Sequence, residues 1–420
     1  MKYSSWRQLA LLLIVAFALR MAAGGVWQAR LDGRFALGDS ESYWQLGRAI
    51  AEGRPYVYGQ QYAQVFRTPG YPLLLTPIFL LAGDGQGAVL LARAEAALFG
   101  TLAVLGVWWI ALLLFDRQAA WIAALLAAFY PGAIVSSVLV LSEAPFCPLM
   151  LLQMALCILA WNAPTSDRRI AWGFAAGLAA GAATLMRPGW LLFTPLAAAV
   201  LMMPRATPTA KQRAAIAFCM ILGLAAAMSP WWIRNARVTG RFVPTTLQVG
   251  AGLYDGLNTD ADGSSDMDFV DRFIAEERLK SKGSTDGPSP EFEQRLDRRM
   301  RDEALAWAWA NPGRAARLAG KKFLRMWNVW PNERRLSGWP IRLTVFLTYT
   351  PLLFFAIIGA GRTLGRGWPY ILCWLPAVYL TMLHVVFVSS IRYREPAMLA
   401  LLALAAGEIG ARIERRGNSG

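Results

Sequence analysis

The sequence predicts an all-α fold: a polytopic membrane protein of about ten transmembrane helices with two long extracytoplasmic loops. Three observations lead to this prediction. Hydrophobic residues make up 56% of the 420 residues, charged residues only 16%, and the mean hydropathy is +0.37. Apolar runs recur at lengths near the roughly 20 residues that cross a bilayer as a helix. The excess of basic residues, a net charge of +15, lies largely in short connections between these runs, so it indicates topology and not a nucleic-acid partner.

Ten apolar runs can be drawn as membrane spans. They cover residues 8–28, 86–114, 118–136, 143–161, 170–186, 189–203, 214–233, 341–361, 368–388 and 396–411. With the N-terminus in the cytoplasm, every inward connection carries Lys or Arg, as the positive-inside rule requires. We therefore expect a multi-pass protein of the cell (inner) membrane with both termini in the cytoplasm.

The outward side of this topology holds two long segments and three tight hairpins. The long segments are residues 29–85 and 234–340, and the hairpins lie near 137–142, 187–188 and 389–395. We expect a transmembrane catalytic core at 1–254 that includes the first outer loop, a helical extracytoplasmic loop at 255–340, and C-terminal transmembrane helices at 341–420.

Local signals predict three further helices in the outward segments. Residues 72–81 are apolar but too short to span, which indicates an interfacial helix. Ser289 followed by Pro290 predicts the start of a helix that ends at Asn311, because Ser caps a first turn and Pro fits its first position. After Pro312, apolar and basic residues alternate at helical spacing, which predicts a helix along the membrane surface.

Two arginines fall inside predicted spans, Arg20 in the first and Arg93 in the second. A charge inside the membrane is costly and usually faces a partner or a cavity. Glu95 is a candidate partner for Arg20 if the first two spans pack together.

Acids and arginines gather in the predicted outward turns. These are Asp39, Glu41 and Tyr43 in the first loop, Ser142 with Glu143, Arg187 before Pro188, Trp232 with Arg234 and Asn235, and Arg392, Tyr393 and Arg394. The threading therefore predicts a site of carboxylates and guanidiniums at the outer rim of the bundle.

Taken in order along the chain, these motifs resemble those of a known family. The ordered set is Asp39-Ser40-Glu41 with Tyr43, residues 66–72 (FRTPGYP), Ser142-Glu143, Arg187-Pro188, residues 232–235 (WIRN), residues 310–313 (ANPG) and Arg392-Tyr393-Arg394. It resembles the GT-C superfamily of membrane glycosyltransferases, specifically the bacterial branch related to protein O-mannosyltransferases and the lipid A aminoarabinose transferase. The resemblance implies transfer of a sugar, with inversion, from a polyprenyl-phosphate sugar donor to a lipid, glycan or protein acceptor at the extracytoplasmic face. It also implies that Asp39 matches the acidic residue of the family's first outer loop.

The chemistry of such a transfer suggests residue roles. The donor's phosphodiester becomes a phosphate monoester, so negative charge grows on the leaving oxygen, and donors aimed at that charge lower the barrier. Arg suits phosphate best; Arg392 and Arg394 are the first candidates for donor phosphate binding, with Arg187 and Arg234 second. Asp39 is the candidate base for the acceptor hydroxyl.

Glu41 and Glu143 complete the candidate catalytic set. Either could orient Asp39, bind sugar hydroxyls or, with Asp39, hold Mg²⁺ or Mn²⁺, because hard cations prefer carboxylate oxygens. The candidate substrate-binding residues are Tyr43, Arg67, Tyr71, Trp232, Asn235, Tyr393 and His384.

Each assignment has a structural alternative. The acids could cap helices, the arginines could contact lipid headgroups, and His384, the only histidine, could be a hydrogen-bonded core residue. For the whole protein the alternatives are a transporter or flippase of a lipid-linked sugar, which would need polar groups through the midplane, and a non-catalytic membrane scaffold.

Overall fold

Long apolar helices dominate the structure, a computed structural model that describes residues 2–59, 63–203, 207–280, 289–330 and 338–417. Within these ranges the chain forms helices and no strand, which confirms the all-α prediction. Seven of the helices found there are long and apolar enough to cross a bilayer. They are α1 (Lys2–Gln28), α4 (Gln86–Leu114), α7 (Glu143–Asn162), α8 (Ser166–Met186), α10 (Ala210–Thr239), α15 (Trp339–Thr363) and α17 (Glu395–Gly417).

Shorter helices occupy the other three predicted spans. They are α5 (Arg117–Phe129) with α6 (Pro131–Ser136), η1 (Pro188–Trp190) with α9 (Phe193–Leu201), and α16 (Ile371–Val386). The span predicted at 118–136 is divided because Tyr130 precedes a proline and takes an extended conformation, with ψ of 117°. The number of ten crossings stays a prediction.

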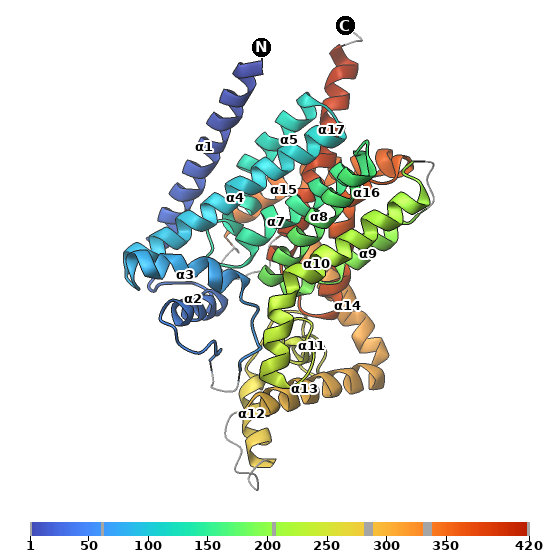
Figure 1. The fold of residues 1–420 in the computed structure, drawn as a ribbon. Helices are drawn as coiled ribbons and strands as arrows, with labels where there is room; N and C mark the ends of the chain where they lie inside the picture. Colours follow the sequence, from blue (N-terminus) through green and yellow to red (C-terminus); the bar gives the residue numbers. More distant parts are fainter. Residues whose placement is uncertain (1, 60–62, 204–206, 281–288, 331–337, 418–420) are drawn as a thin grey trace.

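The remaining helices lie mainly outside the bundle. They are α2 (Gly38–Ala51), α3 (Gly70–Ala82), α11 (Val249–Gly256), α12 (Phe269–Lys280), α13 (Pro290–Ala310), α14 (Pro312–Trp327), η3 (Leu364–Arg366) and η4 (Ile391–Arg394). In Figure 1 both chain ends lie at one end of the bundle, and α11, α12 and α13 lie at the other, which we call the distal end.

The predicted helix signals near the distal end are confirmed. Ser289 caps α13 by accepting a hydrogen bond from the Phe292 N–H, and the helix ends before Asn311. Helix α14 follows at once, and its buried face packs against α16 and η4. Its contact with a membrane surface stays a prediction, as does the division of the chain at 254/255, a boundary that α11 crosses.

The pairing predicted for Arg20 is wrong. Its guanidinium donates instead to the carbonyls of Ala127 and Ala128, at 3.1 and 3.2 Å, and to Ala16 of its own helix. Ala127 and Ala128 end α5, where helix carbonyls lack partners within the helix. Arg20 therefore satisfies the helix end that the Pro131 break leaves open.

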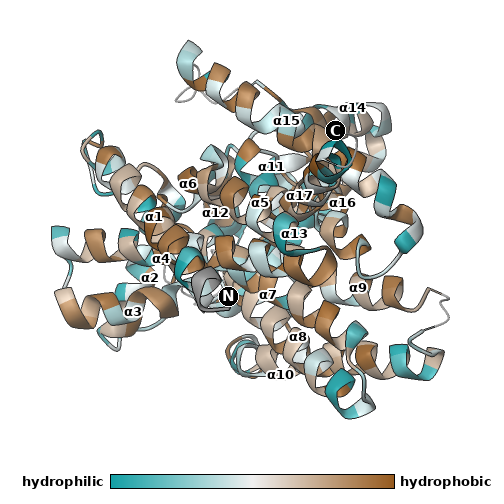
Figure 2. Cartoon of the chain, turned by 90° about the horizontal axis from the view of Figure 1, so that it is seen from above, coloured by the Kyte–Doolittle hydropathy of each residue, from teal (hydrophilic) through white to brown (hydrophobic). Residues whose placement is uncertain are grey.

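The outer surface of the bundle is apolar. Ile14, Phe218 and Ile357, on three of the long helices, are each more than 60% exposed, and Figure 2 shows hydrophobic residues along many of the bundle helices. Lipid tails can cover such a surface without cost, whereas water cannot.

Helices α8 and α10 cross in close contact at Gly177 and Gly223. A Cβ built on Gly177 would lie 2.2 Å from the Met220 carbonyl oxygen, and one on Gly223 would lie 2.2 Å from that of Phe174. Small residues let backbones approach this closely in membrane proteins.

We expect Gly177→Ala to destabilise the protein by more than about 1 kcal/mol, because the added methyl overpacks the crossing. The matched control is Gly361→Ala in α15, where a Cβ would meet nothing within 4 Å. That control should be neutral or stabilising by up to about 1 kcal/mol, since Ala favours helix. Thermal unfolding of both variants in detergent measures the difference, and equal effects would contradict this account of the crossing.

Candidate functional site

Asp39 lies between two guanidiniums at the distal end. It occupies the first turn of α2, where the partial positive charge of a helix N-terminus favours a carboxylate. Arg67 Nη2 donates to its Oδ1 at 2.6 Å, and Arg392 Nη2 donates to its Oδ2 at 3.0 Å. The two arginines come from the loop before α3 and from η4, so the carboxylate joins three distant parts of the chain.

Aromatic rings hold Arg67 in place. Its guanidinium carbon lies 5.1 Å from the ring centre of Tyr43 and 5.4 Å from that of Tyr58, within the range of a cation–π contact. The hydroxyl of Tyr56 donates to the carbonyls of Arg67 and Thr68, which fixes the backbone. The sequence analysis missed Tyr56 and Tyr58, whose only signal is an aromatic pair upstream of the Arg67 motif.

A second carboxylate, Glu143, extends the cluster. It lies buried at the start of α7, and Arg187 Nη1 contacts its Oε1 at 2.6 Å. Arg392 Nε lies 3.7 Å from the same oxygen, so Arg392 bridges Glu143 and Asp39. Arg187 is extended because it precedes Pro188. We call Asp39, Arg67, Glu143, Arg187 and Arg392 the ionic cluster.

Aromatic residues from the predicted set surround the ionic cluster. Tyr393 accepts a hydrogen bond from Arg392 at 3.0 Å, and the ring of His384 stacks on it at 4.2 Å. His384 is buried and its Nδ1 lies 2.9 Å from the Val388 carbonyl, the geometry of its hydrogen-bonded core alternative. Tyr71 packs edge-on against Tyr43.

Ser142 links this aromatic layer to Glu143. Its hydroxyl lies 3.3 Å from the Tyr43 hydroxyl, which donates to it, and 3.5 Å from Oε2 of Glu143. Ser142 precedes α7, but its side chain makes no capping hydrogen bond to that helix.

The ionic cluster has more positive than negative charge, because three arginines face two carboxylates. Burial alone would raise the pKa of Asp39, but the charges and hydrogen bonds of Arg67 and Arg392 outweigh it and lower that pKa to about 2. Asp39 is therefore ionised at neutral pH. The excess of arginines over carboxylates gives the cluster an electrostatic attraction for one more anion.

Two of the predicted residues lie close in sequence but point elsewhere. Glu41 accepts a hydrogen bond from Gln45 of its own helix. Arg394 is buried; it donates to the carbonyls of Met326 and Asn328, and its guanidinium carbon lies 3.7 Å from the ring centre of Tyr349. The structure thus brings Arg392, and not Arg394, to Asp39.

A second predicted group holds the end of α10. Arg234 donates to the Gln64 carbonyl at 2.7 Å, Trp232 donates to the Pro244 carbonyl, and the amide of Asn235 donates to the Val243 and Thr245 carbonyls. These contacts tie the helix to the chain on either side of it. They do not bring the three residues into the ionic cluster.

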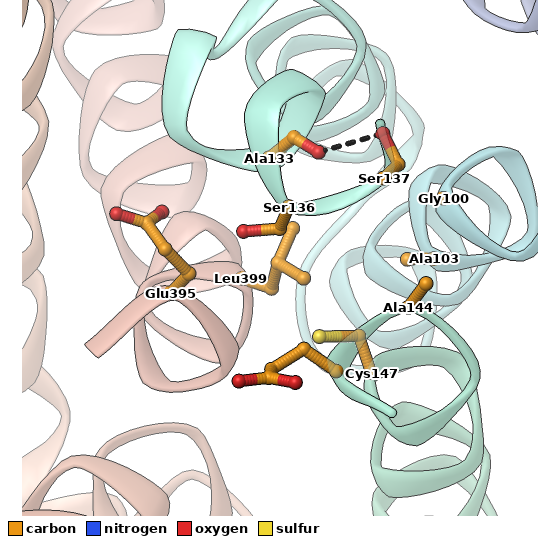
Figure 3. Close-up of a pocket in the computed structure, with 10 residues that line it drawn as sticks. Gly100, Ala103, Ala133, Ser136, Ser137, Ala144, Cys147, Glu395 and Leu399 are labelled. Carbon is orange, nitrogen blue, oxygen red and sulfur yellow. Dashed lines mark hydrogen bonds between the residues drawn. The ribbon is translucent and has the colours of Figure 1, made fainter. Parts of the chain in front are cut away.

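A small cavity lies on the bundle side of Glu143. Its lining joins Glu143 to Glu395, whose Oε2 is buried without a hydrogen-bond partner while Oε1 accepts from the Tyr130 hydroxyl. Figure 3 shows Glu395, Ser136, Ser137 and Cys147 around this cavity. Ser137, which follows α6, donates to the carbonyl of Ala133 in that helix. Arg394 Nε lies 3.7 Å from Oε1 of Glu395.

The carboxylates of Asp39 and Glu41, predicted as ligands of Mg²⁺ or Mn²⁺, are engaged with other side chains. Both oxygens of Asp39 are engaged by guanidiniums, and Glu41 bonds to Gln45. Among the residues that the structure describes, no three His, Cys, Asp or Glu side chains come together as ligands. Binding of Mg²⁺ or Mn²⁺ by Asp39 and Glu41 stays a prediction.

Comparisons with solved structures agree with the fold. The oligosaccharyltransferase of Archaeoglobus fulgidus, tethered with an acceptor peptide, is 14% identical over 99% of this chain and 51% of its own, with a TM-score of 0.60. The same archaeal enzyme, AglB, in complex with an inhibitory peptide and a dolichol-phosphate is 14% identical over 95% and 50%, with a TM-score of 0.58. ArnT from Cupriavidus metallidurans bound to undecaprenyl phosphate is 16% identical over 99% and 79%, with a TM-score of 0.47. This chain spans about half the length of the archaeal enzyme, and at 14% identity the likeness to that enzyme shows the fold alone.

The sequence itself carries the family. No curated protein matches the chain. The family described as dolichyl-phosphate-mannose-protein mannosyltransferase matches residues 10–234, more than half of the chain and the part that holds Asp39, Arg67, Glu143 and Arg187. The chain therefore belongs to the dolichyl-phosphate-mannose-protein mannosyltransferase family of GT-C glycosyltransferases.

Proposed function

We propose that the protein transfers a sugar from a polyprenyl-phosphate sugar to the hydroxyl of a lipid, glycan or protein acceptor at the extracytoplasmic face, with inversion. The observation that carries this proposal is the Asp39 carboxylate held between Arg67 and Arg392. The glycosyltransferase family supports it, and so does the dolichol-phosphate in the archaeal structure with the same fold.

The arginines suit the leaving group. When the glycosidic bond breaks, the lipid phosphate gains close to a full negative charge. Arg392, Arg67 and Arg187 converge on one place and exceed the local carboxylates by one charge. Guanidiniums already fixed in position stabilise that charge as it develops, which lowers the barrier rather than only improving binding.

Asp39 is the proposed base, and its low pKa sets a condition on that role. A carboxylate with a pKa of about 2 is a weak base while both arginines bind it. A donor phosphate that accepts hydrogen bonds from Arg67 and Arg392 in these positions competes with Asp39 for their positive charge and raises the pKa of Asp39. The donor thereby activates the base, and the acceptor hydroxyl is deprotonated only when a donor is in place.

Glu143 is the proposed positioning acid. It pairs with Arg187 and lies within 3.7 Å of Arg392. Because its carboxylate is buried at the start of α7, it holds both guanidiniums close to that end of the helix.

We propose that the distal end faces outward. Both chain ends lie at the opposite end (Figure 1), and the basic connections predicted to be cytoplasmic lie on the side of the chain ends in the threading. In the proposed orientation the ionic cluster lies at the outer face of the cell membrane.

The central prediction concerns transfer by the purified full-length protein in lipid, given a panel of radiolabelled polyprenyl-phosphate sugars. Asp39→Asn should lower turnover by about 10²- to 10⁴-fold through loss of the base. Arg392→Ala should lower it by about 10²- to 10³-fold through loss of charge stabilisation.

The matched control for this transfer is Glu52→Gln, an exposed acid that follows the same helix and pairs with Arg48 and Arg54. Its turnover should equal that of wild type. Full activity of Asp39→Asn would contradict the proposed base. In sealed vesicles of known orientation, activity with the donor confined to the cytoplasmic face would contradict the proposed sidedness.

A second prediction separates the two groups of arginines. Arg187→Ala and Arg392→Ala should each weaken binding of a polyprenyl phosphate by roughly 10- to 100-fold, since a hydrogen bond to a charged group contributes about 1.5–3 kcal/mol. Arg234→Ala, whose guanidinium donates to a main-chain carbonyl, should leave affinity unchanged. Titration by intrinsic tryptophan fluorescence measures the three constants, and an equal loss in Arg234→Ala would restore that residue to the donor site.

A third prediction follows from the pKa of Asp39. Because its folded-state pKa of about 2 lies below the ordinary value of 3.8, its ion pairs contribute stability that is complete above that ordinary value and is lost as the pH falls toward 2. The difference in unfolding midpoint between wild type and Asp39→Asn should therefore shrink over this range. Thermal unfolding at a series of acid pH values tests it, and a difference that stays constant would show that the ion pairs are weak.

A further inference from the structure

The segment between α16 and α17 carries Arg392 and has little regular structure of its own. Residues 387–390 are not helical, and η4 is a single short turn. The place of Arg392 relative to Asp39 therefore depends on what holds this backbone.

Helix α14 contacts the start of this segment through Lys322. The side chain of Lys322 is fully buried, with 0% exposure, and its Nζ donates to the carbonyls of Val386 and Gly256 at 2.8 Å each. Burial lowers the pKa of Lys322 to about 8. A buried ammonium is costly, and here its hydrogen bonds go to main-chain carbonyls of two separate segments.

The next turns of α14 contact the middle and the end of the segment. Arg325 Nε donates to the Ser389 carbonyl at 2.9 Å. Arg394 reaches back from the segment and donates to the carbonyls of Met326 and Asn328. Lys322, Arg325 and Met326 lie three and four residues apart, so they line one side of α14.

Two glycines bring further main chain against the same segment. The Ser389 N–H donates to the Gly263 carbonyl at 3.1 Å. A Cβ on Gly256 would lie 2.6 Å from the Phe387 carbonyl oxygen, so only glycine permits this approach. Residues 386–394 are thus held at both ends and in the middle by the α11–α14 part of the chain.

We propose that α14 holds residues 386–394 in place. Lys322, Arg325 and Arg394 are then positioning residues that fix Arg392 against Asp39. This inference rests on the proposed function for its catalytic consequence, though the mechanical part stands alone. A displacement of about 1 Å in a charge-stabilising group can cost about 10²-fold in rate.

The first experiment measures hydrogen–deuterium exchange of the full-length protein in lipid, independent of activity. Lys322→Met should raise exchange across residues 386–394 at least several-fold, because it removes the hydrogen bond to the Val386 carbonyl at the start of the segment and the one to Gly256, whose main chain lies against Phe387. The matched control is Lys321→Met, which changes the exposed neighbour on the same helix and should leave exchange as in wild type. Unchanged exchange in Lys322→Met would overturn the proposal that α14 holds residues 386–394 in place.

The second experiment is a double-mutant cycle on sugar transfer, which a purely structural role would not satisfy. Lys322→Met should lower kcat by about 10- to 100-fold in the wild-type background, and by much less in an Arg392→Lys background, because it acts through Arg392. Equal losses in both backgrounds would overturn the positioning role. Transfer absent from wild type would contradict the proposed function, and exchange would still decide whether α14 holds the segment.

Discussion

The ion pairs between Asp39 and the guanidiniums of Arg67 and Arg392 fix the distal end of the molecule. They join residues 28 and 353 positions apart in the chain, so the first turn of α2, the loop before α3 and the η4 turn must keep their relative places. Glu143 and Arg187 add the starts of α7 and η1 to the same set. The hydrogen bonds between a carboxylate and a guanidinium are lost when the groups separate by about 1 Å more, so the bundle helices that carry these turns have little freedom to slide.

Much of this site follows from chain topology. In a bundle of antiparallel spans, every second connection lies at the same end, so motifs in alternate turns meet there whatever their distance in sequence. That reasoning placed Asp39, Glu143, Arg187 and Arg392 together, and the structure brings them into contact. The all-α fold follows in the same way from composition and run length, whereas the break at Pro131 depends on one residue and was missed.

Side-chain direction is what the sequence analysis could not give. Residues two apart on a helix point to different sides, so with α2 beginning at Gly38, Asp39 faces the arginines while Glu41 turns to Gln45. The same holds in η4. With three residues per turn, this helix directs Arg392 and Arg394 to different sides. Neither helix start was predicted, and without it both members of each pair were equally good candidates.

The arrangement around Asp39 also bears on how a reaction cycle would end. A site with high affinity for a doubly charged lipid phosphate releases it slowly, and slow product release limits turnover in many enzymes. Here the protein carries its own competing anion within hydrogen-bond distance of the same guanidiniums. In the proposed cycle, Asp39 would bind Arg67 and Arg392 again after it has released its proton, and this would help to displace the lipid phosphate.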